Sequence, residues 1–270
     1  MADSVREIVL GVLAAGVTAA LGWFARTYLW RRALRRKQRF FGLAPHSECV
    51  LVVNRDPASP TWSVARRDAF ALLDLAALVK DCEAHPDIVA HDEAQQGFGE
   101  RTEFCVGGPA SNLRTAAHLR AFLPGVVVNT EPEPGPDRAA FTIGGDRRPM
   151  EKGRSEYVLL ARLTTGDRGA RPVFLLAGQS GVTQQAAARH LARHHRRLAR
   201  KYGRKGTFCL LLEVRDSDAY GPDVVRVVGD VTRAATAPPP QPPGQAEENT
   251  TPSEGPAAPG GTPQSSESSA

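Results

Sequence analysis

Two short turns carry residue types that can bind an anion. Each follows an apolar, strand-like run and precedes a helical pattern, and the candidate ligand-binding residues are Gly107, Gly108, Ser111, Asn112, Gly178, Gln179, Ser180, Gly181 and Thr183. The first turn of a helix offers unpaired N–H groups and the positive end of the helix dipole, which attract phosphate and other anions. We therefore expect both turns to face one crevice that binds a small anionic or nucleotide-like ligand. The alternative is that glycine only allows the backbone to turn there.

Neither turn contains a known phosphate-binding fingerprint. The P-loop pattern ending in Gly-Lys-Ser/Thr is missing, and neither turn reads G-x-G-x-x-G. Asn112 and Thr183 are the residues that we expect to cap the two helices, because their side-chain oxygens can accept from backbone N–H groups. The sequence does not identify a cofactor.

The sequence offers two catalytic interpretations. GQSGV resembles a nucleophile elbow around Ser180, but Val182 stands where the last glycine belongs, and every histidine lies at or before His195, so the order serine, acid, histidine fails. A nucleotide or glycosidic-bond hydrolase using the same crevice would need a carboxylate base, for which Asp92 and Glu93 are weak candidates. These two residues also suit a solvated polar loop. Whether the chain is an enzyme is left open.

His190 and His194 are four residues apart, a spacing that can hold a metal on a helix. No H-E-x-x-H motif and no third ligand accompany them, so we expect no metal site. The same segment carries six arginines and lysines between residues 189 and 201. We interpret it as a solvated basic face that can meet an acidic partner or an anionic membrane surface.

The amino-terminal segment predicts a membrane anchor. Residues 8–24 read IVLGVLAAGVTAALGWF without a charge, and a helix of this length reaches about 25 Å, close to the hydrocarbon core of a bilayer. A cleaved signal peptide would place its cations before the apolar run, whereas here they follow it. A buried amphipathic helix would not be apolar on all sides. We expect a transmembrane anchor over residues 1–30, in contact with lipid through residues 8–30.

Basic residues cluster directly after this run. Of 34 lysines and arginines, seven lie between residues 26 and 39, and their removal leaves 27 against 29 acidic residues. The net charge of +5 is therefore local, and specific binding to nucleic acid is not expected. Cationic flanks remain in the cytoplasm, so the amino terminus is predicted outside, the rest of the chain is predicted in the cytoplasm, and residues 31–39 are predicted to touch anionic lipid.

The remaining elements predict an α/β domain with a mainly parallel, Rossmann-like sheet covered by helices on both faces, because apolar strand-like runs alternate with helical patterns. Strands are expected at 48–56, 87–91, 102–108, 125–129, 156–164, 172–178, 207–215 and 223–231, the last two as an antiparallel edge pair, and helices at 65–84, 113–123 and 183–202. Residues 31–47 form a basic link, residues 48–233 the domain, and residues 234–270 a disordered tail rich in proline, serine and glycine.

Four cysteines occur, at positions 49, 82, 105 and 209, without a Cys-x-x-Cys pair. We expect buried free thiols, which suit a reducing compartment.

The two turns also carry a family resemblance. GGPASN at 107–112 and FLLAGQSGVTQQAAARHL at 174–191 resemble the motifs of membrane-anchored Rossmann-like proteins of GC-rich bacteria, over about residues 48–231. Here Val182 precedes Thr183 where that group has a Gly-Thr pair. The resemblance implies a fold and an anchor but no reaction. The overall prediction is a single-pass membrane protein with a cytosolic domain that acts as a sensor or interaction module. The alternatives are the hydrolase or a structural adaptor without a ligand.

Overall fold

A seven-stranded sheet organises the chain in the computed structural model, which describes residues 2–56, 59, 62–131, 135, 137–167, 169–203 and 205–238. The strand order is β10-β9-β7-β8-β3-β1-β2, and five of the seven strands run in the same direction. The strands of this sheet are β1 (Glu48–Val53), β2 (His85–Ala90), β3 (Thr102–Val106), β7 (Ser155–Leu163), β8 (Val173–Gly178), β9 (Phe208–Arg215) and β10 (Val225–Asp230). The predicted α/β class with a mainly parallel sheet is confirmed.

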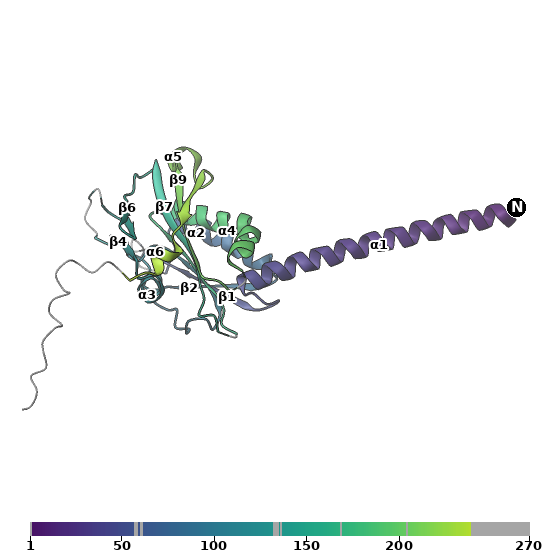
Figure 1. Ribbon diagram of the computed structural model, residues 1–270, viewed down its shortest axis with the longest axis horizontal. Coiled ribbons are helices and arrows are strands. Elements are labelled where there is room, and N and C mark those ends of the chain that lie inside the picture. The colour runs from purple at the N-terminus through teal and green to yellow at the C-terminus, as the bar shows by residue number, and fades with distance from the viewer. Residues whose placement is uncertain are drawn as a thin grey trace, which may run out of the picture. The chain divides into compact units, whose positions relative to one another are not determined.

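Helices cover both faces of this sheet (Figure 1). The helices are α1 (Ala2–Phe41), α2 (Arg66–Lys80), α3 (Leu113–Phe122), α4 (Gly181–Tyr202), α5 (Ser217–Tyr220) and α6 (Thr232–Thr236). One face packs against α2, α4 and the end of α1, and the other against α3, α6 and a second sheet of three short strands, β4 (Val126–Val128), β5 (Phe141–Ile143) and β6 (Asp146–Arg148).

Alternation along the strands explains these two cores. Leu51 and Phe104 point to the first core, whereas their neighbours Val52 and Cys105 point to the second. Successive side chains of a strand lie on opposite faces, so a strand covered on both sides must be apolar at nearly every position. This requirement produces the continuous apolar runs of the sequence.

Among the residues whose side chains the structure describes, helix α1 packs against the core of the domain through its last turns. Phe40 and Phe41 are 1% and 0% exposed and lie in the first core, the Gln38 side chain donates to the Cys82 carbonyl at 2.9 Å, and Lys37 pairs with Asp81 at 3.0 Å. The residues described between Leu10 and Leu29 are nearly all exposed. The predicted link at 31–47 is therefore helical as far as Phe41.

Among the residues whose side chains the structure describes, no helix is long and apolar enough to cross a membrane. The side chains of residues 2–9, 12 and 14 lie outside that described part, so the predicted apolar run 8–24 is only partly covered by this finding.

Two predicted strands do not take the places expected for them in the main, parallel sheet. The run predicted at 125–129 forms β4, which pairs with β5 in the small sheet and does not join the main one. The run predicted at 156–164 forms β7, which lies between β8 and β9 and is antiparallel to both. Both runs are apolar, and apolarity reports burial but not strand direction or sheet membership.

Several other predictions are confirmed. The last two strands form an antiparallel edge pair, β9 and β10. The four cysteines are buried and free.

At the carboxyl-terminal side, the domain extends past the boundary predicted at residue 233. Helix α6 crosses this position, and its Ala235 is 0% exposed. From residue 239 onward the predicted tail lies outside the described residues.

Candidate functional site

The two glycine-containing turns lie next to each other at the carboxyl edge of β3 and β8. These strands are parallel neighbours, with Val106 opposite Leu176. A Cβ added to Gly108 would lie 3.2 Å from the Gly178 carbonyl oxygen, so the two turns are in direct contact. The juxtaposition predicted from the sequence is confirmed. In parallel α/β sheets, ligands usually bind at this edge.

Two asparagines pack at the first turn, and Asn112 holds it by hydrogen bonds. Asn112 is fully buried, its Oδ1 accepts from the Thr115 N–H at 3.0 Å, and its Nδ2 donates to the Val106 carbonyl at 3.0 Å, which confirms it as the cap of α3. Gly107 has a φ of +127°, and a Cβ there would collide with the Asn54 amide. Glycine is required at this position because the backbone is left-handed and the space is already filled.

The second turn is bonded to a different set of groups. The Gln179 side chain donates to the carbonyl oxygens of Ala139 at 2.9 Å and Arg148 at 3.2 Å, and its Oε1 accepts from the Tyr157 N–H at 2.7 Å. Each polar atom of this side chain thus has a partner within the chain. Gln179 ties the small sheet to the main one.

The cap predicted at Thr183 is wrong, because α4 begins two residues earlier, at Gly181, and Ser180 is its cap. Ser180 Oγ accepts from the Thr183 N–H, and Thr183 Oγ1 contacts the Ser180 backbone in return, which forms a capping box. Thr183 therefore takes the third helical position. The sequence pattern Ser-x-x-Thr could have indicated this, although the usual third residue is Glu or Gln.

Carboxylates of the chain itself face the start of α4. Asp68, at 8% exposure, places Oδ1 2.9 Å from a Cβ added to Gly181. Burial raises the pKa of Asp68. Glu156, at 2% exposure, accepts from Ser180 Oγ at 3.0 Å and from Ser217 Oγ at 3.1 Å. These two carboxylates lie where the positive end of the α4 dipole attracts negative charge.

The weak candidate bases lie on the loop after β2. Arg55 donates to Asp92 Oδ1 at 3.0 Å and to Glu93 Oε1 at 2.5 Å, and both carboxylates are exposed. Desolvation of Asp92 is outweighed by its hydrogen bond from Arg55, so its pKa is lowered. A lower pKa makes a carboxylate a weaker base. Next to them, His91 Nδ1 accepts from the Leu113 N–H at 3.4 Å, so the loop does reach the first turn.

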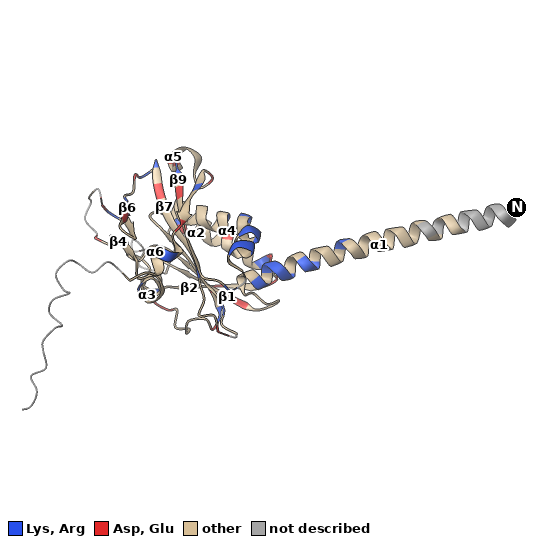
Figure 2. Cartoon of the chain, in the orientation of Figure 1, with Lys and Arg blue, Asp and Glu red and all other residues tan. Residues whose placement is uncertain are grey.

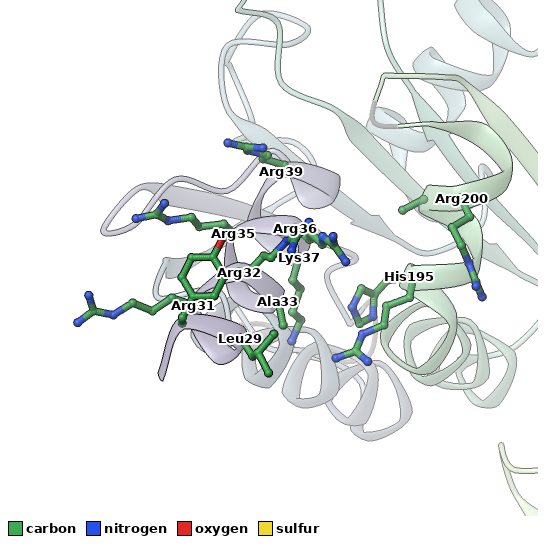
Figure 3. A pocket seen from close by; sticks show the side chains of 13 residues that line it. Leu29, Arg31, Arg32, Ala33, Arg35, Arg36, Lys37, Arg39, His195 and Arg200 are labelled. Atoms are coloured by element: carbon green, nitrogen blue, oxygen red, sulfur yellow. The ribbon is translucent and has the colours of Figure 1, made fainter. Parts of the chain in front are cut away.

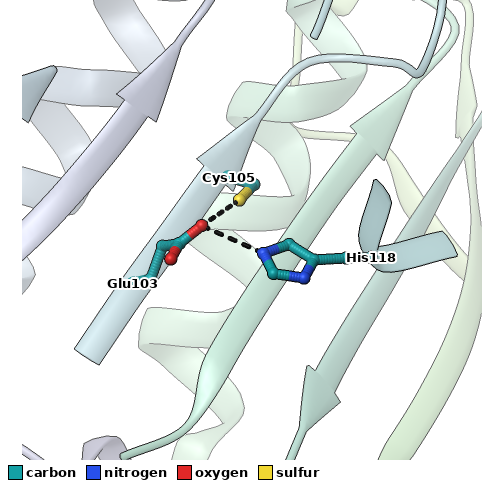
Figure 4. Close-up of side chains that lie close together, drawn as sticks. All are labelled: Glu103, Cys105 and His118. Carbon is teal, nitrogen blue, oxygen red and sulfur yellow. Dashed lines mark hydrogen bonds and ion pairs between the residues drawn. The ribbon is translucent and has the colours of Figure 1, made fainter. Parts of the chain in front are cut away.

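A buried polar cluster that the sequence analysis did not identify lies between β3 and α3 (Figure 4). Glu103 on β3 is 1% exposed and accepts from Arg114 at 2.9 and 2.8 Å, from Cys105 at 2.9 Å and from Gln96 at 3.1 Å, with His118 at 3.1 Å. The signal was a glutamate inside the apolar run TEFCV, with Arg114 and His118 four residues apart on the following helix.

This cluster has metal-ligand residue types, since Glu103, Cys105 and His118 place ligand atoms within 4.8 Å of one another. Its chemistry does not fit a metal. Burial, followed by the Glu103 charge, raises the pKa of the Cys105 thiol, which keeps its proton and donates a hydrogen bond to Glu103. Metals bind the thiolate instead. Arg114 already supplies the positive charge that the carboxylate needs. We therefore describe the cluster as an ion-pair network that joins α3 to β3.

His190 and His194 lie on α4 with ring centroids 4.2 Å apart and stacked. Burial, followed by the charges of His194, Arg197 and Arg193, lowers the pKa of His190 to about 4. Five of the six cations predicted on this face are exposed, in agreement with a solvated basic face: Arg193, Arg196, Arg197, Arg200 and Lys201.

The clefts described on the surface lie away from the two turns. Three of them have volumes of about 1370, 380 and 760 Å³. Their linings include none of the predicted ligand-binding residues and neither of the candidate bases Asp92 and Glu93. The largest lies between α1 and α4. Comparison of the chain with protein-family models, with curated proteins and with solved structures finds no match.

Proposed function

We propose that the chain is a single-pass membrane protein whose α/β domain is held at the cytoplasmic side of the bilayer as an interaction module. The observation that supports this proposal is the exposure of α1. Nine large apolar side chains of this helix are 55% to 64% exposed: Leu10, Leu13, Val17, Leu21, Trp23, Phe24, Tyr28, Leu29 and Trp30. Contiguous exposed apolar surface of this kind marks a membrane or a partner.

The distribution of residues along α1 favours a membrane over a partner helix. The apolar side chains surround the helix instead of forming one stripe, as expected for contact with lipid on all sides. Trp23, Tyr28 and Trp30 come at the end of the apolar run, where aromatic side chains favour the membrane interface. Arginines follow directly, which supports the cytoplasmic placement of the domain.

The edge of the sheet contributes less to this proposal. Asn112, Gln179 and Ser180 bond to groups of the same chain, and two carboxylates face the α4 terminus. The binding of an anionic or nucleotide-like ligand there stays a prediction, as does hydrolysis with Asp92 or Glu93 as base. The proposed interaction module uses its surface.

Alkaline carbonate extraction of the full chain from phosphatidylcholine vesicles tests the tether. We expect the chain to remain with the membrane. Leu13→Lys with Val17→Lys should release it, because each lysine near the bilayer centre costs about 2.5–3.5 kcal/mol. The matched control is Leu73→Lys with Val227→Lys, the same changes at exposed domain positions.

Release of the unchanged chain by carbonate would contradict the tether. So would retention of the Leu13→Lys, Val17→Lys variant to the same extent as its control. The orientation is tested separately, by protease added outside intact bacterial cells that express the chain. Digestion of the α/β domain under those conditions would contradict the cytoplasmic placement.

A further inference from the structure

The largest described cleft lies where the basic end of α1 passes α4, and Figure 3 shows it from close by. Its volume is about 1370 Å³. Thirteen residues from these two helices line it: Tyr28, Leu29, Arg31, Arg32, Ala33, Arg35, Arg36, Lys37, Arg39, His195, Arg196, Ala199 and Arg200. The sequence predicted two separate basic segments, and the structure brings them together as the walls of one cleft.

The walls of this cleft carry unbalanced positive charge. Eight of the thirteen residues are arginine or lysine, and no aspartate or glutamate is among them. Lys37 pairs with Asp81 at 3.0 Å, whereas the seven arginines have no ion pair among the described residues. Figure 2 shows the basic residues on the end of α1 and on α4. Such unneutralised charge creates a potential that attracts anions.

The cleft is held in shape by the core beneath it. The His195 ring lies 6.4 Å from the Phe40 ring and 5.8 Å from the Phe41 ring, and its Nδ1 bonds to the Ala192 carbonyl at 2.8 Å. Burial lowers the pKa of His195, and the neighbouring Lys37 and Arg196 lower it further. This packing holds the end of α1 beside α4, so the cations of both helices line the same cleft.

One end of the cleft is apolar and aromatic. Tyr28 and Leu29 line it there, at the end of the exposed apolar part of α1, and they are 64% and 60% exposed. An occupant thus meets apolar surface at one end and guanidinium groups along the rest. A phosphate group accepts hydrogen bonds from guanidinium well, because the planar fork matches its oxygens.

We propose that this cleft binds the headgroup of an anionic phospholipid, with its phosphate between the arginines of α1 and α4 and its acyl chains beside Tyr28 and Leu29. This inference rests on the proposed membrane tether, which it makes more specific. A nucleic acid would also meet the arginines. It would leave the apolar end of the cleft unused, and the position of the cleft beside the apolar helix favours lipid.

The test is lipid binding by the full chain in dodecylmaltoside micelles, measured by native mass spectrometry. We expect dioctanoyl phosphatidylglycerol to bind more tightly than dioctanoyl phosphatidylcholine or glycerol phosphate. Arg196→Gln with Arg200→Gln should raise its Kd about 25-fold, since each basic residue contributes about 1 kcal/mol, or about fivefold. The matched control is Arg193→Gln with Arg197→Gln, on the part of α4 that lines another cleft, and it should change the Kd less than about twofold.

Equal effects of the two arginine pairs would overturn the proposal, because they would indicate unspecific charge attraction. Equal binding of the two lipids would overturn it as well, and so would an oligonucleotide that displaces the phosphatidylglycerol at equal concentration. Failure here is distinguishable from failure of the tether. If carbonate releases the chain but the chain prefers phosphatidylglycerol, only the membrane tether is refuted. If the chain stays with the membrane but does not prefer phosphatidylglycerol to phosphatidylcholine, only lipid binding in the cleft is refuted.

Discussion

Replacement of Arg114 by methionine will leave a buried carboxylate without its cation. Glu103 is 1% exposed, and Arg114 donates to it from Nε at 2.9 Å and from Nη2 at 2.8 Å. Only the weaker donors His118, Gln96 and Cys105 then remain. Removal of one partner from a buried ion pair costs about 3–5 kcal/mol. Because three donors remain, we expect the lower end, a loss of about 3 kcal/mol in the free energy of unfolding.

The assay is urea denaturation of the full chain at pH 7, followed by the reactivity of its thiols. All four cysteines are buried, so they react with a thiol reagent only when the domain unfolds, whatever α1 does. The expected loss moves the urea midpoint down by about 1–2 M for a domain of this size. Arg120→Met is the control, because Arg120 lies exposed on the same helix without an ion pair among the described residues. It should change stability by less than about 0.5 kcal/mol.

The pH dependence gives a second readout. Burial acts to raise the pKa of Glu103, but the hydrogen bonds from Arg114, His118 and Cys105 outweigh it and hold the pKa well below its usual range. The unchanged chain therefore loses this stabilisation as the pH falls below the usual pKa of 4.5. In the variant, burial without Arg114 raises the pKa, so protonation at low pH restores stability.

The difference in the free energy of unfolding between the unchanged chain and Arg114→Met should thus be smaller at pH 4 than at pH 7. A difference that does not change with pH would refute this reasoning. So would an Arg120→Met variant as unstable as Arg114→Met. Adding Glu103→Gln to Arg114→Met should recover stability, because it removes the unpaired charge.

Three further predictions concern the other sites. Gly107→Ala should cost about 1–3 kcal/mol in urea denaturation, because φ is +127° and the Asn54 amide fills the space, whereas Gly229→Ala meets open space and should cost less. Because the pKa of His190 falls from 6.5 to about 4 on folding, stability should fall as the pH drops through that range, and a His190→Gln variant with an unaltered slope would contradict this. Nucleotides at about 100 times Kd should add about 2.7 kcal/mol of stability, so millimolar nucleotides that leave Tm unchanged would contradict the predicted anion site.

The sequence carried enough information to place β3 beside β8. Glycine-rich exits after two apolar runs, each followed by a helix, are typical of parallel strands at one sheet edge, and this arrangement was found. The direction of β7 was not predictable in the same way. Its residues Val158 to Leu163 are buried on both faces, and a strand buried on both faces is equally apolar whichever direction it runs.

Partners that lie far apart in the sequence explain what was missed at the site. Asp68 reaches the start of α4 from a helix more than a hundred residues earlier, and Gln179 bonds to carbonyl groups of the small sheet. The residue types of the two turns show which hydrogen-bond donors and acceptors they contain. They do not show that other groups of the same chain already pair with these donors and acceptors.

Helix α1 continues without a break from its exposed apolar part to the core of the domain. No break separates Trp30, at the end of the exposed apolar part, from Phe40 in the core, and these ten residues span about 15 Å of helix. Each residue inserted between them would rotate the domain by about 100° about the axis of α1 and move it about 1.5 Å along that axis. The length of this segment therefore sets the angle at which the domain is joined to the exposed apolar part of α1.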